Sequence, residues 1–295
     1  MVTADRTLAE VSEEGLLHSI FPFFAARPAL LVGPGDDAAV VAAGSAVVAT
    51  TDSMVRGRDW LDDWSTAADV GAKVLTQNLA DVAAMGGVTT SVLITLVADP
   101  ATPADWARDL ARSIGERAAL AGVAVAGGDL SSAPAGVLVV SVTALGDLEG
   151  RPPVLRSGAR PGDLVALAGT LGRSAAGLAL LQRGEPGEPG EASEPRGASE
   201  PGSRPATPAG AGDGGAGSRG IRQGCLEHHL RPTSPVAEGP RAARAGATAI
   251  IDVSDGLLRD ADRVARASGV ELALRSGALE AHVAPLAEVL GPEAA

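Results

Sequence analysis

Aromatic residues are scarce in this sequence: they make up 2% of its 295 residues, and tyrosine is absent. A hydrophobic content of 45% still allows a packed core, which must be built largely from Ala, Val and Leu. Cysteine occurs once, at Cys225, which excludes an intrachain disulfide framework and a cysteine metal cluster. Lysine also occurs once, at Lys73, and we attribute this shift toward arginine to nucleotide bias in the genome.

Basic residues are also few compared with acidic ones, since 24 Lys and Arg residues stand against 36 Asp and Glu residues and give a formal net charge of −12. This balance argues against a nucleic-acid partner, which requires a basic footprint, but it allows phosphate ligands if metal ions mediate the contact. No apolar stretch reaches the roughly 18 residues of a membrane span. The first residues, MVTADRTLAEVSEEG, also lack the basic and apolar pattern of a secretory signal. We therefore expect a cytoplasmic protein with no membrane partner.

The length suits about two domains, and we place them at residues 1–150 and 151–295. Residues 184–220 stand apart, because they contain no Val, Ile, Leu, Met, Phe or Trp. Such a segment cannot bury enough apolar surface to offset the entropy of ordering it. We expect it to be a disordered insertion in the second domain.

Apolar periodicity and turn residues predict alternating strands and helices, in an order of roughly β-α-β-β-α-β for the first domain, and hence an α+β fold. Helices are expected at residues 65–85, 102–121, 174–183, 236–245, 257–268 and 279–290, and strands at 46–49, 91–98, 123–126, 137–144, 163–168, 248–253 and 271–274. Neither GxGxxG after a strand nor GxxxxGK[ST] is present, so the standard mononucleotide folds are not indicated.

Five acidic clusters lie at the ends of the predicted strands or on a helix: Gly35-Asp36-Asp37, Thr50-Thr51-Asp52, Asn78-Leu79-Ala80-Asp81, Gly127-Gly128-Asp129 and Asp252-Val253-Ser254-Asp255-Gly256. Carboxylates with neighbouring hydroxyls and few His or Cys residues suit a hard cation such as Mg²⁺. Each cluster also has a structural explanation. The first is good turn chemistry, Asp81 fits a buried salt bridge, and the last two fit a turn and a helix start. A shared cation site explains all five together.

The chain resembles the thiamine-monophosphate kinase family, within the aminoimidazole ribonucleotide synthetase superfamily, through six motifs in order: GPGDDAAVV, TTDSMVRG, QNLADVAAMGG, AGGDLSS, LRSGARPGDLVALAGTLGRSAAGL and IIDVSDGLLRDADRVARASG. The resemblance covers about residues 10–183 and 230–275. It implies a two-domain fold, with an N-terminal domain that binds metal and ATP and forms a homodimer, and a C-terminal α/β domain.

The resemblance further implies phosphorylation of thiamine monophosphate to thiamine diphosphate, by direct in-line transfer from ATP at several Mg²⁺ ions, without a phosphoenzyme. Its implied ATP contacts are Gly128, Arg156 and Ser254, and its implied metal ligands are Asp37, Thr50, Thr51, Asp52, Asp81, Asp129, Asp252 and Asp255. Asp36 would support the turn that presents Asp37.

The sequence departs from the family pattern in two places. The family has a substrate-binding His in a G-x-H-F pattern after the TTD motif, whereas here Asp59 holds that place in Gly57-Arg58-Asp59-Trp60. A carboxylate there would suit a thiazolium cation and repel a phosphate. The family's later GGEDYELL-like segment and terminal aromatic are also absent from the sequence given. We therefore expect this polypeptide to bind Mg-ATP and to phosphorylate thiamine monophosphate poorly or not at all.

Two alternatives stay open at this stage. One is a non-catalytic or truncated nucleotide-binding homologue, which would bind ATP and Mg²⁺ without turnover. The other is a different enzyme of the same superfamily. The selenophosphate synthetase and hydrogenase-maturation relatives are disfavoured, because this sequence lacks their N-terminal reactive and C-terminal cysteines, respectively. The DVSDGL and AAMGG motifs favour the thiamine enzyme over the synthetase itself.

Overall fold

The structure is a computed structural model, and it describes residues 6–25, 27–28, 30–32, 40–44, 46–184 and 214–291. Contacts divide the chain into two units, each formed by two segments. The first unit consists of Met1–Gly169 and Leu230–Leu274, and the second of Thr170–His229 and Arg275–Ala295. The expected boundary lay at residue 150, whereas this division by contacts assigns residues 151–169 and 230–274 to the first unit as well.

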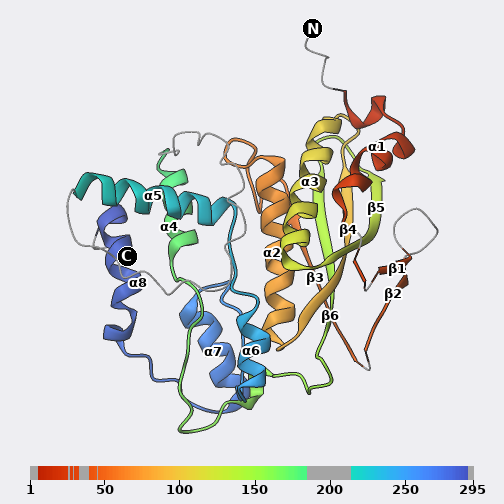
Figure 1. Cartoon of the computed structure of the whole chain (residues 1–295). Coiled ribbons are helices and arrows are strands. Elements are labelled where there is room, and N and C mark those ends of the chain that lie inside the picture. The colour runs from red at the N-terminus through yellow and green to blue at the C-terminus, as the bar shows by residue number, and fades with distance from the viewer. Residues whose placement is uncertain are drawn as a thin grey trace. The chain divides into compact units, whose positions relative to one another are not determined.

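A four-stranded sheet forms the centre of the first unit, with the strand order β3-β6-β4-β5. Strand β6 is antiparallel to both of its neighbours, and β4 is parallel to β5. The strands and the helices between them are β3 (Val47–Val55), α2 (Ala67–Ala84), β4 (Val88–Ala98), α3 (Ala104–Ala121), β5 (Ala124–Ser132) and β6 (Leu138–Asp147). The α+β class is confirmed, but the expected order β-α-β-β-α-β is wrong in detail, because α3 precedes both of the last two strands. Figure 1 shows α2 and α3 together over one face of the sheet.

The two helices begin and end close to where their sequence signals predict. Thr66 caps α2 in a capping box, in which its hydroxyl and the carboxylate of Asp69 each accept a hydrogen bond from the other residue's backbone N–H. Gly86, with φ of 75°, follows the C-cap of α2. Gly122 adopts the left-handed conformation that ends α3, as expected. Helix α3 begins after Pro103, which occupies its N-cap position without a side-chain hydrogen bond.

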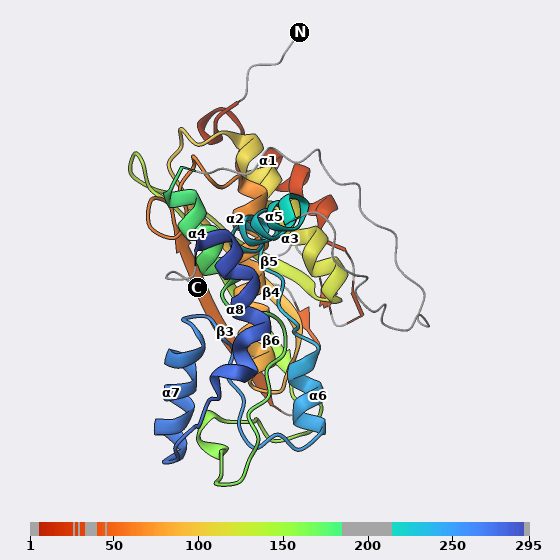
Figure 2. The ribbon, with the colours of Figure 1, turned by 90° about the vertical axis from the view of Figure 1, so that its left-hand side faces the viewer.

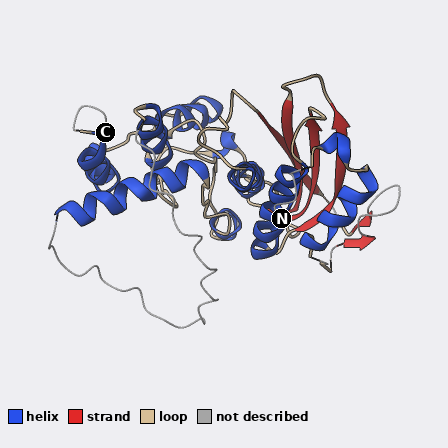
Figure 3. Cartoon of the chain, turned by 90° about the horizontal axis from the view of Figure 1, so that it is seen from above, coloured by secondary structure: helices blue, strands red, loops and turns tan. Residues whose placement is uncertain are grey.

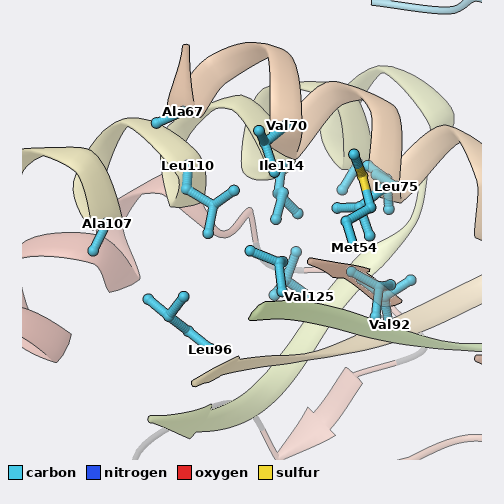
Figure 4. Close-up of a cluster of buried hydrophobic side chains, with 14 of the residues drawn as sticks. Met54, Ala67, Val70, Leu75, Val92, Leu96, Ala107, Leu110, Ile114 and Val125 are labelled. Atoms are coloured by element: carbon cyan, nitrogen blue, oxygen red, sulfur yellow. The ribbon is translucent and has the colours of Figure 1, made fainter. Parts of the chain in front are cut away.

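The main core lies between α2, α3 and the covered face of the sheet (Figure 4). Leu75, Val92 and Ile114 are fully buried there, and the core consists mostly of Val, Leu and Ala, as the shortage of aromatics predicts. The two helices approach each other closely at Gly71, where an added Cβ would lie 2.8 Å from the carbonyl oxygen of Leu110. A larger residue at that position would push the helices apart.

Strand β5 has a bulge at Ala126, which has no partner on β4, and it continues through Gly127 and Gly128 to Ser132, beyond the predicted end at residue 126. Gly127 has φ of 154°, and a Cβ on Gly128 would lie 1.9 Å from the carbonyl oxygen of Ile94. Only glycine fits so near a neighbouring strand. The Gly127-Gly128-Asp129 cluster is therefore part of a strand, and the alternative of a simple turn is wrong.

Smaller elements complete the first unit: η1 (Leu8–Glu10), α1 (Glu13–Ile20), η2 (Phe21–Phe23), β1 (Leu30–Val32), β2 (Val40–Val41), η3 (Arg156–Gly158), α6 (Glu238–Arg244) and α7 (Leu257–Ser268). Strands β1 and β2 pair with each other in a separate antiparallel sheet. The predicted helices at residues 236–245 and 257–268 are confirmed as α6 and α7. Among the described residues, none of the helices has both the length and the apolar character that crossing a membrane requires.

The second unit contains three helices, α4 (Arg173–Gln182), α5 (Gly214–Leu230) and α8 (Ser276–Leu290), which Figure 2 labels. Gly177 brings α4 against α5, since an added Cβ would lie 2.2 Å from the carbonyl oxygen of Cys225. The predicted disordered insertion ends earlier than expected, because residues 214–220 form the start of α5. Residues 185–213 of the insertion lie outside the described residues.

Three strands expected after residue 150 do not form, at residues 163–168, 248–253 and 271–274. The part of the chain that the structure describes contains no strand after β6, as the colouring of Figure 3 shows. A strand needs a hydrogen-bonded neighbour, and these segments have none. Their apolar side chains stay accessible as a result, with Leu164 95% and Val165 55% exposed.

Replacing Leu75 by Ala should destabilise the fold by about 2–5 kcal/mol, because the deletion leaves a cavity between α2 and the sheet. Urea denaturation would measure the change. Leu120 on α3 is 89% exposed and provides the matched control, since Leu120→Ala should change stability by less than about 0.5 kcal/mol. Similar losses for the two variants would contradict the core described above.

Candidate functional site

Helix α2 is fastened to edge strand β3 by a buried amide, that of Asn78. Its side-chain oxygen accepts a hydrogen bond from the backbone N–H of Asp52 at 3.1 Å, and its amide nitrogen donates to the carbonyl oxygen of Val74 at 2.8 Å. Asn78 is completely buried. A second link lies nearby, where the hydroxyl of Thr50 donates to Oδ2 of Asp81 at 2.7 Å. These contacts bring Asp52 and Asp81 to one edge of the sheet.

The periods of the two elements explain why these residues meet. Side chains alternate across a strand, so Thr50 and Asp52 share the covered face of β3 with the buried Met54. Asn78 and Asp81 are three positions apart on α2 and therefore lie on one helix face. The spacing of the TTD and NLAD motifs thus predicts a site shared by strand and helix.

Asp252, from the segment before α7, completes the group electrostatically. Burial raises the pKa of the Asp52 carboxyl, and the negative charge of Asp252 raises it further. Burial also raises the pKa of Asp81, the hydrogen bond from Thr50 opposes this, and Asp52 and Asp252 add to the increase. Arg156, in η3, acts in the opposite direction and lowers the pKa of Asp81. We call Thr50, Asp52, Asp81 and Asp252 the acidic cluster.

The donor set of the acidic cluster suits a hard divalent cation. All of its donors are oxygens, and its carboxylates repel one another, so a cation between them would relieve the repulsion. In the described residues, no three His, Cys, Asp or Glu side chains form a ready-made metal cage. A cation here would therefore complete its shell with water or with oxygens of a phosphate ligand, as Mg²⁺ commonly does.

Two predicted ligands lie on the other face of the sheet. The hydroxyl of Thr51 donates to the carbonyl oxygen of Val142 at 3.0 Å and accepts from Thr143 at 3.1 Å. Asp129 is exposed and accepts a hydrogen bond from Ser131 at 2.7 Å. Its neighbour Leu130 packs against the core, so Asp129 faces away from the core. The structure therefore does not bring the side chains of Thr51 and Asp129 into the acidic cluster.

The carboxylate of Asp255 forms an ion pair with an arginine. Its Oδ2 lies 2.5 Å from Nη2 of Arg263, and Nη1 of Arg263 bonds Oδ1 of the buried Asp260 at 2.6 Å. The neighbouring Ser254 is exposed in the loop before α7, and Gly128 lies in β5, paired with Ile94 of β4. Asp36 and Asp37 lie outside the described residues, so the metal role of Asp37 and the turn role of Asp36 stay predictions.

Asp59 closes the turn that follows β3, because its Oδ2 accepts a hydrogen bond from the backbone N–H of Val55 at 2.8 Å. It also lies near Lys73, the only lysine in the sequence. Burial lowers the pKa of Lys73, and the negative charge of Asp59 partly opposes that decrease. The predicted substrate role of Asp59 stays a prediction.

The sequence predicted no role for Asp260, Arg263 or Ser268, and it indicated Asn78 only as a member of the cluster Asn78-Leu79-Ala80-Asp81. The structural role of Asn78 could have been predicted, because a polar residue three positions before Asp81 belongs to the same helix face. Arg263 and Asp260 lie eight and five positions after Asp255, and only the structure shows that they face it. In the sequence, an arginine of an amphipathic helix that pairs with a carboxylate cannot be distinguished from an arginine that only faces solvent.

Comparison with known proteins places these residues in a family. Residues 35–148 match the model of the AIR synthase related protein, N-terminal domain. The thiamine-monophosphate kinase of Mycobacterium tuberculosis is 39% identical over 282 residues, covering 95% of this chain and 74% of that protein. The crystal structure of the enzyme of the same name from Stenotrophomonas maltophilia gives a TM-score of 0.67 at 31% identity, covering 87% of this chain and 72% of that one. The structure of AaThiL complexed with AMPPCP and TMP gives 0.60 at 27%, covering 83% and 71%.

The crowded carboxylates lead to a prediction about stability without metal. Because the pKa values of Asp52 and Asp81 are raised in the fold, the folded chain binds protons more tightly, and the free energy of unfolding falls as pH rises above about 4. Asp81→Asn removes one charge, so we expect this metal-free variant to melt at a higher temperature than the unmodified chain at pH 7. The difference should disappear below about pH 4, where the carboxyl is protonated in both states.

Scanning calorimetry at several pH values would measure this difference. Asp63 is exposed and lies outside the acidic cluster, so Asp63→Asn is the control and should bring no such gain. Equal melting temperatures for Asp81→Asn and the unmodified chain at pH 7 would show that the cluster is not under electrostatic repulsion.

Proposed function

The chain belongs to the thiamine-monophosphate kinase family, whose members transfer a phosphoryl group from ATP to thiamine monophosphate, and we propose that it performs this transfer on Mg²⁺ held by the acidic cluster. The observation that supports the metal is the convergence of Asp52 and Asp81 near Asp252, because burial and neighbouring negative charge make Asp52 and Asp81 costly to keep ionised without a cation. Bound Mg²⁺ would neutralise charge on the transferring phosphate oxygens.

The residues of the cluster have separable tasks. Asp52, Asp81 and Asp252 supply carboxylate oxygens to the cation. Thr50 orients Asp81 by its hydrogen bond, and Asn78 holds the backbone of Asp52 in place. Phosphoryl transfer depends on such positioning and on charge neutralisation more than on covalent chemistry, which fits a chain that lacks a P-loop lysine.

Arg156 is the cationic group of the proposed ATP site. Its positive charge lowers the pKa of the Asp81 carboxyl, and this effect supports placing Arg156 near the proposed cation. A guanidinium there can bind phosphate oxygens with two hydrogen bonds. The other ATP and metal contacts that the resemblance implies stay predictions: Gly128 and Ser254 for ATP, and Asp37, Thr51, Asp129 and Asp255 for metal.

We also propose a homodimer formed through the uncovered face of the sheet. In the described residues, no helix covers this face, and a sheet normally packs a second layer on at least one face and often on both. Val47 is 50% and Leu93 40% exposed there, beside the hydroxyls of Thr51, Ser53 and Ser141. A second copy with the same surface would cover the apolar residues on both chains.

We also propose that the enzyme acts in the cytoplasm, because its reaction consumes ATP.

The metal assignment predicts that Asp52→Asn and Asp81→Asn each lower kcat by roughly two orders of magnitude or more, because each removes a carboxylate from the proposed cation site. Steady-state turnover of thiamine monophosphate at limiting Mg²⁺ would measure this, with Asp63→Asn as control. Turnover equal to that of the unmodified chain would refute the assignment. Loss of folding in Asp81→Asn would support a structural salt bridge instead.

The same assay decides the rival function. ATP and Mg²⁺ binding by the unmodified chain, seen by calorimetry, with no formation of thiamine diphosphate would support a non-catalytic nucleotide-binding homologue. Measurable turnover would exclude that homologue.

The dimer proposal predicts that Leu93→Arg yields a monomer, because the charge cannot be buried at an apolar interface. Sedimentation velocity would measure the oligomeric state, and circular dichroism would confirm folding. Leu120→Arg places the same charge on the exposed surface of α3 and should leave the dimer intact. A folded dimer of Leu93→Arg would show that the interface lies elsewhere.

A further inference from the structure

Ser268, the last residue of α7, holds both ends of the short turn that carries Arg156. Its hydroxyl donates to the carbonyl oxygen of Arg156 at 2.7 Å and accepts from the backbone N–H of Ala159 at 3.1 Å. One side chain therefore satisfies the backbone acceptor of the first residue of the turn and the backbone donor of the residue that follows it. No sequence motif assigned a task to this serine.

The turn itself, η3, has little to hold it. It is three residues long, and its own hydrogen bond, from Gly158 N–H to the carbonyl oxygen of Leu155, is long at 3.4 Å. A 3₁₀ turn of this length has poor hydrogen-bond geometry and depends on neighbours for its position. The neighbour that supplies side-chain hydrogen bonds is Ser268.

The opposite side of the turn packs against the segment that leads to Asp252. A Cβ on Gly158 would lie 1.8 Å from the carbonyl oxygen of Thr248, so the two backbones are in direct contact. Thr248 also donates its hydroxyl to Asp163 at 2.6 Å, and that same carboxylate accepts from Arg160 N–H at 2.8 Å. The turn is thus fixed between α7 and the segment of Asp252.

The first turn of α7 organises the other half of the site. Asp260, 1% exposed, accepts from the backbone N–H of Asp255 at 3.0 Å and binds Arg263. Helix α7 therefore fixes the Asp252–Asp255 loop near its start and the Arg156 turn at its end. Its 12 residues set the spacing between the two.

We propose that Ser268 is a positioning residue that aims Arg156 at the phosphates of ATP. The inference rests on the proposed function, in which Arg156 contacts ATP. A guanidinium on a long side chain is useful only if its backbone is held in place, because otherwise binding must supply the ordering entropy. The hydroxyl of Ser268 prevents that loss by holding the carbonyl of Arg156 itself.

Ser268→Ala removes both hydrogen bonds that hold the turn of Arg156, and we expect it to weaken ATP binding about fivefold, because part of their free energy must then be supplied on binding. KM for ATP should rise by a similar factor while kcat stays within about twofold, since Arg156 holds ATP before and during transfer. Ser268→Thr keeps the hydroxyl and should restore the affinity. Titration calorimetry with Mg-ATP and steady-state kinetics on the full chain would measure both quantities.

Ser113→Ala is the matched control. Ser113 also lies on a helix and donates to a backbone carbonyl of a neighbouring helix, that of Ala68, at 2.7 Å. Removing its hydroxyl deletes a bond of the same kind between α3 and α2, so ATP affinity should not change. Weakening by both variants to the same extent would overturn the inference, because it would indicate general loosening of the fold.

A double-mutant cycle with Arg156→Ala separates the two proposals. If Ser268 acts through Arg156, Ser268→Ala should have no further effect on ATP affinity in the Arg156→Ala background. Additive effects would overturn the inference while leaving Arg156 as an ATP ligand. Unchanged affinity in Arg156→Ala alone would instead overturn the assignment of Arg156 in the proposed function, and the inference with it.

Discussion

A single buried amide determines where the carboxylates of this site can lie. Asn78 joins the backbone of β3 to the backbone of α2, so the strand residue Asp52 and the helix residue Asp81 have one relative position. Replacing this amide with an apolar side chain would leave the backbone N–H of Asp52 without a hydrogen-bond acceptor from α2. The repulsion between Asp52 and Asp81 follows from this contact, because it depends on how close the scaffold holds the two carboxylates, and Asp252 adds to it from a separate segment.

The carboxylates of the site repel one another, and the surrounding fold holds them close despite this repulsion. Burial and neighbouring carboxylates raise the pKa values of Asp52 and Asp81, and the free energy for this strain comes from the apolar core beneath them. Strained functional groups on a stable scaffold are common in enzymes, because a site that is relaxed when empty gains less from its ligand. The contacts of α7 extend the same principle, since the proposed cationic group is also held by residues outside the site.

Local signals in the sequence predicted the first unit well. The helices expected at residues 65–85 and 102–121 depend on signals within one or two turns, and both are confirmed as α2 and α3. The convergence of Asp52 and Asp81 was also predictable, from motif order and the family resemblance. The strands expected at residues 163–168 and 248–253 were wrong, because apolar sequence indicates burial but cannot supply a pairing partner. Likewise the pairing of Asp255 with Arg263 depends on the direction of α7, which no local pattern encodes.

The alternation of side chains along β3 links the two surfaces that the proposed function requires. Thr50 and Asp52 point to the face that α2 covers and build the acidic cluster, whereas Thr51 and Ser53 point to the uncovered face and bond with β6. A slip of one residue in the β3–β6 register would exchange these sets, moving carboxylate to the uncovered face and hydroxyls to the cluster. The nine uninterrupted pairs between β3 and β6 oppose such a slip. The register of one strand pair therefore sets both the chemistry of the covered face and the surface offered to a second copy.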